Sequence, residues 1–423
     1  MAKKKMTLEE KLEEAIVKDA PYEVPKNWIW TNLKNVGELV TGNTPSKNNS
    51  EFYGSEIAFI KPTDLNQGRN LSIATEYLSL LGGSKARLLP KGSTCVCCIG
   101  ATIGKVAYLN VEGATNQQIN SIIPYKINNL YVYYYTLSNE FNYNLIENSS
   151  STTLPIINKS RMGELTIPIA PLKEQKRIVD KIENLFEKLD KVKELIEEAR
   201  DDFKKRKSAI VYKIINKFSN EKIKLKDCII FITDKKEPVD GDVYIGLENM
   251  GKSTGIIEYS VAENVKSTKT KFNKGDILYG RLRPYLDKHD VADRSGICST
   301  DILVMRANEK FEPRYIDYIL GTLELIRYAN ENSSGINLPR VSAKVLGEYK
   351  IPKIEFDKQK KVVKILNTIF EHEDKIEELT ALEEQIELIK KSILAKAFRG
   401  KLGTNCEEDE SALELLKEIL SKE

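Results

Sequence analysis

The chain has 423 residues, of which 41% are hydrophobic and 30% charged, so it can bury more than one core and is not a mainly disordered protein. Its 65 basic and 62 acidic residues leave a formal net charge of only +3. Any surface that attracts an anion must therefore be local.

The first half of the chain begins with a short helical extension over residues 1–20. Residues 21–171 follow, rich in Gly, Asn, Ser, Thr and Tyr, with short β-prone runs between turn signals, which predicts a strand-rich domain. Residues 172–218 lack Pro and Gly, and their apolar residues recur at alternating steps of four and three. This spacing predicts a long helix with a coiled-coil seam. The seam residues are Ile178, Ile182, Leu185, Leu189, Val192 and Ile196.

The second half has the same order of elements. Residues 219–356 predict a second strand-rich domain, 357–403 a second long helix, and 404–423 an acidic helical tail. Because the chain passes through the second domain between the two helices, we expect the helices to pair antiparallel. The seam residues of the second helix are Val362, Leu366, Ile369, Ile376, Leu379, Ile386, Ile389 and Ile393.

Short motifs of the first half recur in the second half at an almost constant spacing. The Leu-Pro pair ending at Pro155 recurs at Pro339, and the Gln-Lys pair starting at Gln175 recurs at Gln359, each 184 residues later. A repeat of this length indicates two copies of one structural unit. We therefore predict an α+β fold, in which two pseudo-repeated strand-rich domains are joined by two long antiparallel coiled-coil helices.

Residues that commonly carry catalysis or bind metals are scarce. His289 and His372 are the only histidines, and three of the six cysteines, Cys95, Cys97 and Cys98, lie in an apolar, β-prone stretch without zinc-ligand spacing. We therefore expect no catalytic residue, no metal site and no bound cofactor. The cysteine usage, with no secretion signal and no run of 18 apolar residues, predicts a cytoplasmic protein that does not contact membranes.

One motif points to a different function. The segment from Gly246 to Ser253 matches the phosphate-loop pattern, which is typical of nucleotide-binding proteins. A phosphate loop must open a helix, whereas β-branched residues and Gly255 follow Ser253 and favour a hairpin or strand. Nucleotide binding is therefore the less favoured alternative.

Several polar segments carry residue types that recognise nucleic acid. Residues 281–288 combine three cations with a tyrosine, and Arg can bind guanine edges or phosphates. Residues 61–64 and 248–249 occupy matching positions in the two halves and carry Asn and acidic side chains, which suit adenine and cytosine edges. Polar loops at 149–153 and 332–337 precede the paired Leu-Pro motifs. Taken alone, residues 281–288 are equally consistent with a solvated turn, and the other loops favour ordinary turns unless both copies share a function. The candidate contacts are Lys61, Thr63, Asp64, Lys105, Ser151, Thr152, Glu248, Asn249, Arg281, Arg283, Tyr285, Lys288, Asn337 and Arg340.

A set of motifs covers nearly the whole chain. It consists of Phe59-Ile-Lys-Pro-Thr-Asp-Leu65, Cys98-Ile-Gly-Ala-Thr-Ile-Gly-Lys105, Tyr244-Ile-Gly-Leu-Glu-Asn249, Gly275-Asp-Ile-Leu-Tyr-Gly-Arg-Leu-Arg-Pro-Tyr285, Ser299-Thr-Asp-Ile-Leu303, the two Ile-Pro…Gln segments that enter the long helices, and Lys396-Ala-Phe-Arg-Gly-Lys401. With this set the chain resembles the specificity subunit of a Type I restriction-modification system.

The resemblance implies a non-catalytic subunit of a methyltransferase and endonuclease complex. In that family two target-recognition domains each read one half of a bipartite DNA sequence, and the two helices set the gap and dock the methylation subunits. The implied partners are double-stranded DNA, two methylation subunits and, through the complex, restriction subunits. S-adenosylmethionine and ATP are expected only on those partners. A non-enzymatic coiled-coil scaffold that carries two protein-binding domains is the main alternative.

Overall fold

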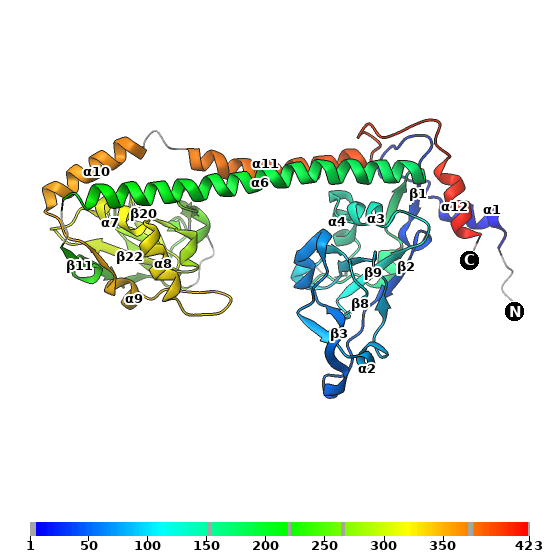
Figure 1. The fold of residues 1–423 in the computed structure, drawn as a ribbon, viewed down its shortest axis with the longest axis horizontal. Helices are drawn as coiled ribbons and strands as arrows, with labels where there is room; N and C mark the ends of the chain where they lie inside the picture. Colours follow the sequence, from blue (N-terminus) through cyan, green and yellow to red (C-terminus); the bar gives the residue numbers. More distant parts are fainter. Residues whose placement is uncertain (1–5, 151–153, 219–220, 264–266, 371–374, 422–423) are drawn as a thin grey trace. The chain divides into compact units, whose positions relative to one another are not determined.

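The protein consists of two compact units, each with strand-rich and helical parts (Figure 1). The computed structural model describes residues 6–150, 154–218, 221–263, 267–370 and 375–421, with the backbone alone for 375–381. Unit 1 comprises Met1–Lys191 and Gln385–Glu423, and unit 2 comprises Val192–Glu384. The predicted α+β class is confirmed.

Two four-stranded sheets form the centre of unit 1. The first is antiparallel, in the order β2 (Gly37–Thr41), β9 (Ile119–Pro124), β6 (Thr94–Cys97), β7 (Val106–Tyr108). The second has the order β4 (Glu76–Leu78), β3 (Tyr53–Ile60), β8 (Gly113–Thr115), β5 (Leu88–Leu89), with β3 and β8 parallel. A separate ladder joins β1 (Ile29–Asn32) to β10 (Thr166–Ile169). The helices of this domain are α2 (Leu80–Gly83), α3 (Asn129–Thr136), α4 (Asn139–Glu147) and α5 (Lys159–Gly163).

The cysteine cluster of unit 1 is part of its core. Successive residues of a strand point to opposite faces, so Val96 packs in one apolar cluster while Cys95 and Cys97 pack in another. All three side chains are fully buried. The apolar character of this stretch therefore reflects a central strand that is covered on both faces.

The sheets of unit 2 repeat this plan. One has the order β12 (Ile229–Ile232), β22 (Ile302–Ala307), β19 (Ile277–Gly280), β20 (His289–Val291), and the other has the order β13 (Lys235–Lys236), β18 (Lys269–Phe272), β21 (Gly296–Cys298), β14 (Val243–Ile245), β17 (Ser260–Val261). Two further ladders join β11 (Lys222–Lys224) to β23 (Lys350–Pro352) and β15 (Met250–Gly251) to β16 (Gly255–Ile256). The helices of this domain are α7 (Pro313–Leu320), α8 (Leu323–Glu331) and α9 (Ala343–Glu348).

Strand register confirms the internal repeat. Thr94 pairs with Ile122 between β6 and β9, and Ile277 pairs with Met305 between β19 and β22, so both partners are displaced by the same 183 residues. The parallel strand pair of unit 1, β3 with β8, also has its counterpart in β14 with β21. The two units therefore share topology and register.

The paired Gln residues have the same structural role in both units. Gln175 and Gln359 are completely buried at the start of their helices. The Gln175 side chain accepts a hydrogen bond from the backbone N–H of Asn128 (2.9 Å), and Gln359 accepts one from Glu312 (2.8 Å). A buried amide must be satisfied by internal partners, so this residue ties each long helix to the loop before α3 or α7.

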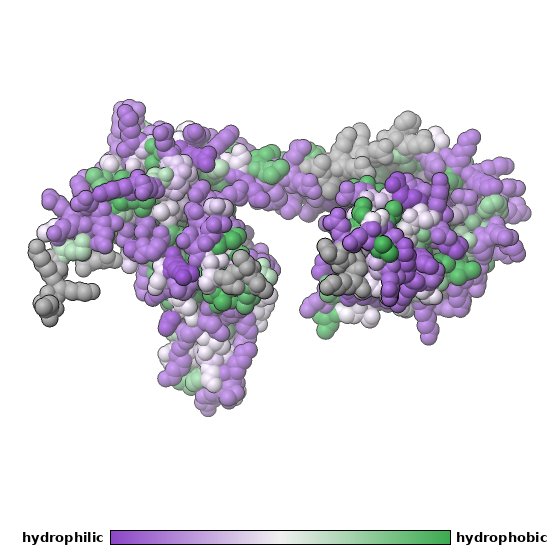
Figure 2. All heavy atoms as spheres, turned by 180° about the vertical axis from the view of Figure 1, so that it is seen from behind, coloured by the Kyte–Doolittle hydropathy of each residue, from purple (hydrophilic) through white to green (hydrophobic). Residues whose placement is uncertain are grey.

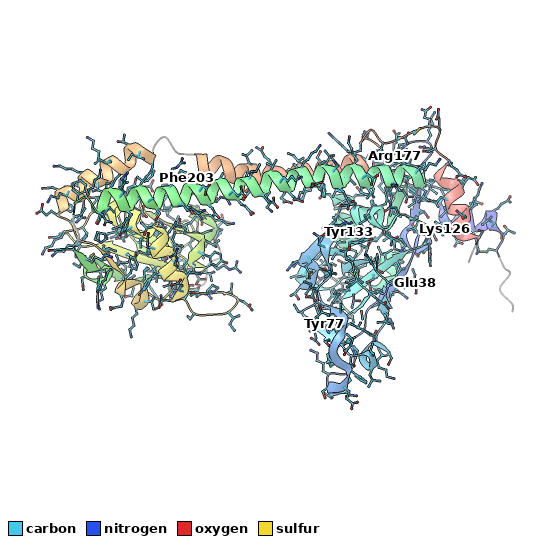
Figure 3. All side chains as sticks on the ribbon, in the orientation of Figure 1. Glu38, Tyr77, Lys126, Tyr133, Arg177 and Phe203 are labelled. Carbon is cyan, nitrogen blue, oxygen red and sulfur yellow. The ribbon has the colours of Figure 1, made fainter. Side chains whose placement is uncertain are left out.

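The long helices are α6 (Leu172–Ile215), α10 (Phe356–Phe370) and α11 (Lys375–Ala397). In unit 1, Arg177 near the start of α6 (Figure 3) donates a hydrogen bond to the Thr404 carbonyl (3.0 Å). Farther along α6, Asp190 pairs with Lys390 (2.6 Å). Residues later in α6 thus contact residues earlier in the segment formed by α11 and the loop after it, which confirms the antiparallel pairing.

Burial along the helices separates the predicted seam into buried and exposed positions. Ile178, Ile182 and Ile393 belong to the core cluster of unit 1, and Val362 and Leu366 to that of unit 2. The remaining buried or partly buried seam residues are Leu185, Leu189, Ile196, Ile369 and Ile386. The side chains of Ile376 and Leu379 lie outside the described residues.

The seam prediction is wrong at two positions. Val192 and Ile389 are each 45% exposed. In unit 2 a position within the apolar stripe of α6 is instead taken by Arg200, which is 10% exposed at its side chain and pairs with Glu383 (3.0 Å). The apolar stripe is therefore interrupted, because a buried ion pair replaces part of the heptad packing.

The two end segments fold against each other on unit 1. α1 (Leu8–Ala15) begins with a capping box at Thr7, and α12 (Ala412–Leu420) is capped by Ser411. Leu12 and Leu416 share an apolar cluster, so these faces cover the protein's own surface. Among the described helices, none combines the length and the hydropathy that crossing a bilayer requires.

Candidate nucleic-acid interface

Three polar segments of unit 2 lie together and form what we call the loop surface of unit 2. It consists of residues 246–253, 281–288 and 333–340. The backbone N–H of Arg283 donates to the Pro339 carbonyl (2.7 Å), and the N–H of Ser253 donates to the Asp287 carbonyl (2.9 Å). These bonds hold segments that are far apart in the sequence on one face of the domain.

Cationic and aromatic side chains project from this surface. Arg283 is exposed and its guanidinium makes no hydrogen bond or ion pair within the described part of the chain, and Tyr285 is 47% exposed. Lys288 donates to the Leu247 carbonyl (2.6 Å). Partial burial and then the positive charge of Lys252 lower the pKa of Lys288. Arg283 and Tyr285 are therefore available to a ligand.

The other predicted contacts in this region have internal partners or lie at its rim. Arg340 binds Asp301 through two nitrogens (2.8 and 3.1 Å), and its side chain remains 38% exposed. Arg281 is partly buried and donates its backbone N–H to the Asp301 carbonyl (2.9 Å). Asn337 is exposed. Asp301 thus fixes two of the arginines of the loop surface.

The equivalent loop surface of unit 1 consists of residues 61–70, 98–105 and 149–156, of which 151–153 lie outside the described residues. Gly100 donates its N–H to the Pro155 carbonyl (2.9 Å), which matches the bond made by Arg283 in unit 2. Lys105 donates to the Asn66 side chain (2.9 Å), so it contacts the neighbouring turn just as its counterpart Lys288 does. The two loop surfaces therefore share an equivalent backbone hydrogen bond and an equivalent lysine contact.

Two predicted contacts turn out to support their loops. Asp64 is 3% exposed and accepts from the N–H of Lys61 (2.7 Å), and its counterpart Asn249 is 4% exposed and accepts from Gly246 (2.8 Å). Their oxygens are committed to the turn, so the prediction that they contact DNA is withdrawn. The Lys61 side chain pairs with Glu76 and is only partly exposed.

The remaining candidates stay predictions. Thr63 and Glu248 are exposed at the ends of the two turns. Ser151 and Thr152 lie outside the described residues.

A buried ionic cluster next to the loop surface of unit 2 was not anticipated from the sequence. His289 Nδ1 lies 2.7 Å from Asp317 Oδ1, and its Nε2 lies 3.1 Å from Asp287 Oδ1. Arg314 pairs with both Asp290 (2.6 Å) and Asp317 (2.9 Å). The side chains of His289, Asp287 and Asp317 are only 11%, 6% and 8% exposed. The Asp-Lys-His run that leads into β20 was a possible signal, but nothing in the sequence connected it with α7.

Electrostatics keeps this cluster charged at neutral pH. Burial by itself lowers the pKa of His289, but attraction to Asp317 and hydrogen bonds with both carboxylates raise it to about 10. Burial likewise raises the pKa of Asp287 and Asp317, yet contact with His289 brings the pKa of both below the usual value. An imidazolium is therefore held between two carboxylates.

The phosphate-loop match does not have the required structure. Residues after Ser253 form β16, which pairs with β15 in a hairpin, as the sequence predicted. Lys252 is exposed at the turn of that hairpin and does not precede a helix. The nucleotide-binding alternative therefore lacks its helix N-terminus.

Comparisons with known proteins all find similarity to Type I restriction specificity domains or subunits. Residues 25–200 match the family model described as Type I restriction modification DNA specificity domain. The chain is 42% identical over 103 residues to the specificity subunit of the HindI Type I restriction enzyme of Haemophilus influenzae, an alignment that covers 24% of this chain and only 22% of that relative. It is 25% identical over 300 residues to the EcoDI specificity subunit of Escherichia coli, covering 61% of this chain and 67% of the relative.

A solved structure extends the likeness to most of the fold. One chain from a study of complex assembly and conformational transition in a type I R-M system superposes with a TM-score of 0.60, covering 90% of this chain and 100% of that chain. The sequence identity is 17%, so this likeness concerns the fold alone.

Proposed function

We propose that the chain, which is similar to specificity subunits of Type I restriction enzymes, recognises a bipartite DNA sequence and that each unit reads one half. The observation that carries this proposal is the duplicated loop surface. Both copies have the same backbone connection, Gly100 to Pro155 in unit 1 and Arg283 to Pro339 in unit 2. Two equivalent surfaces with different side chains suit two half-sequences of different base composition.

Within this proposal the chain selects the site and its partners perform the chemistry. S-adenosylmethionine would bind the methylation subunits, and ATP would bind the restriction subunits. Exposed apolar side chains support docking on the long helices, because Leu195 in unit 2 is 63% exposed and Leu388 in unit 1 is 64% exposed. Figure 2 shows small hydrophobic areas on an otherwise hydrophilic surface. Two methylation subunits and a cytoplasmic location complete the proposal.

Selection from random DNA tests the proposed recognition. The full chain, alone and with its methylation subunits, is incubated with a pool of randomised duplexes, and the bound molecules are sequenced. We expect enrichment of two short specified segments separated by an unspecified gap of constant length. Enrichment of no split sequence in either arm would contradict the proposal and would favour a protein-interaction scaffold.

A further inference from the structure

The loop surface of unit 2 contains an unusual set of backbone conformations. Ser253, Arg283 and Asp287 have φ values of 63°, 52° and 53°, and they are the non-glycine residues with positive φ in the described part of the chain. The left-handed region is unfavourable for residues with a Cβ atom. All three belong to the loop surface, where hydrogen bonds between the segments hold them.

Unit 1 has glycine at each equivalent position. The repeat spacing places Ser253 opposite Gly68, Arg283 opposite Gly100, and Asp287 opposite Gly104. The three glycines also have positive φ, at 54°, 80° and 82°. Both units thus have positive φ at these three positions, although Gly68, with ψ −118°, is not in the left-handed helical region that Arg283 and Asp287 adopt. In unit 2 these positions carry side chains that oppose positive φ. Backbone strain of this kind concentrates at functional sites.

The ionic cluster attaches to the end of the strained loop. Asp287 ends the left-handed turn and accepts from His289, which also contacts Asp317 on α7. Tyr315 and Ile316 of the same helix are completely buried in the core cluster of unit 2. The contact therefore links the end of the loop to a helix that is anchored in the core.

Unit 1 has no counterpart of this cluster. The residues equivalent to His289 and Asp317 are Val106 and Tyr133, both of which pack in the apolar core of unit 1. Figure 3 shows Tyr133 on α3, the helix equivalent to α7. Where the loop needs no strained residue, the ionic cluster is absent as well.

The cluster is a support for the loop and does not form a ligand site by itself. It lines a cavity of about 470 Å³, but its cations and carboxylates are already paired with one another. The exposed groups next to it are Arg283 and Tyr285, at the tip of the strained turn.

We propose that Asp287, His289 and Asp317 form a buried brace that holds Arg283 and Tyr285 in position to contact the DNA half-site of unit 2. This inference rests on the proposed function. Asp287, His289 and Asp317 are positioning residues, and Arg283 and Tyr285 are the contacting residues. Preorganisation of the loop reduces the entropy lost on binding and fixes the backbone position from which the Arg283 side chain extends, so the brace affects base discrimination more than general attraction to DNA.

Random-duplex selection with three variants of the full chain tests the brace. Asp287→Gly introduces the residue of unit 1, which relaxes the backbone and removes the carboxylate. His289→Gln removes the charge between the two carboxylates. Arg294→Ala is the control, because Arg294 forms an exposed pair with Asp293 and has no bond to the cluster. Hydrogen exchange of α7 reports whether unit 2 remains folded in each variant.

We expect the first two variants to lose specified bases in one half-sequence only, with at least tenfold weaker discrimination there, while the other half and the control remain unchanged. Binding to duplex of unrelated sequence should change by less than threefold, which a general unfolding of unit 2 would not allow. A full wild-type motif selected by Asp287→Gly would overturn the brace, because a relaxed backbone alone would then suffice. If the wild-type chain selects no split motif, the proposed function fails instead.

Discussion

The two loop surfaces have positive φ at three equivalent positions but accommodate it in different ways. In unit 1, Gly68, Gly100 and Gly104 adopt positive φ without steric conflict, because glycine has no Cβ. In unit 2, side chains at the same positions oppose this conformation by about 1–2 kcal/mol each, although Asp is tolerated better. A buried ionic cluster and hydrogen bonds between loops offset this conformational cost. A duplicated fold can therefore keep its geometry while its loops acquire new side chains.

Removal of one carboxylate from the ionic cluster should give the largest difference in stability between the two units. Asp317→Ala leaves the imidazolium of His289 with one buried carboxylate and deprives Arg314 of a partner. We expect unit 2 to lose about 3–5 kcal/mol of unfolding free energy, the typical cost of breaking a buried charge pair. Hydrogen exchange measured separately for the two units checks this. Tyr133→Phe at the equivalent position of unit 1 is the control and should cost less than about 1 kcal/mol.

The stability of unit 2 should also depend on pH. The folded-state pKa of His289 is raised from 6.5 to about 10, so its contribution is complete below about pH 6.5 and is lost as pH rises through about 10. The slope is at most about 1.4 kcal/mol per pH unit. The charged groups near His289 are Asp287, Asp317, Arg314, Asp290 and the more distant Lys207, and the Tyr279 ring stacks with the imidazole.

Asp287 and Asp317 have lowered pKa values, so their contribution is present above about pH 4 and is lost as pH falls through their folded pKa. Denaturant titrations of the wild type from about pH 2 to 10, with His289→Gln for comparison, measure both branches. An equal slope above pH 7 in the two proteins would contradict an ionised His289 in the cluster.

Loss of the exposed guanidinium should affect DNA more than folding. Arg283→Ala should weaken binding to the selected duplex by about 1–3 kcal/mol if Arg283 reads a guanine, and specificity should relax at that base pair. Fluorescence anisotropy against the selected duplex and its single-base variants measures the loss. Arg161→Ala, on α5 of unit 1, is the control outside both loop surfaces. Equal discrimination by Arg283→Ala and the wild type would remove Arg283 from the set of base contacts.

The smallest expected effect concerns the glycines of unit 1. Gly100→Ala places a Cβ at φ +80°, with the nearest atom of Leu154 at 3.5 Å, so the cost is conformational and there is no steric clash. We expect about 1 kcal/mol of destabilisation, confined to unit 1. Arg283→Gly should leave the stability of unit 2 unchanged or slightly higher. A clear loss of stability in Arg283→Gly would show that its left-handed conformation carries no strain.

The sequence by itself determined the duplication, the α+β class, the antiparallel long helices and the approximate loop positions. Periodicity and spacing are properties of neighbouring residues, so the seam at Ile178 and Ile182 and the hairpin after Ser253 could be predicted. The same patterns predicted a seam at Val192 that the fold leaves exposed, because burial depends on what packs against the helix.

Only the tertiary structure decided which polar residues are available to a ligand. Asp64 and Asn249 have the residue types of base contacts, yet both are buried and hydrogen-bonded within their turns. His289 and Asp317 are separated by 28 residues in the sequence and meet only when α7 packs beside β20. The physical reason is that charge, burial and backbone strain at a site depend on groups brought together from distant segments, whereas the repeat and the helices follow from local order.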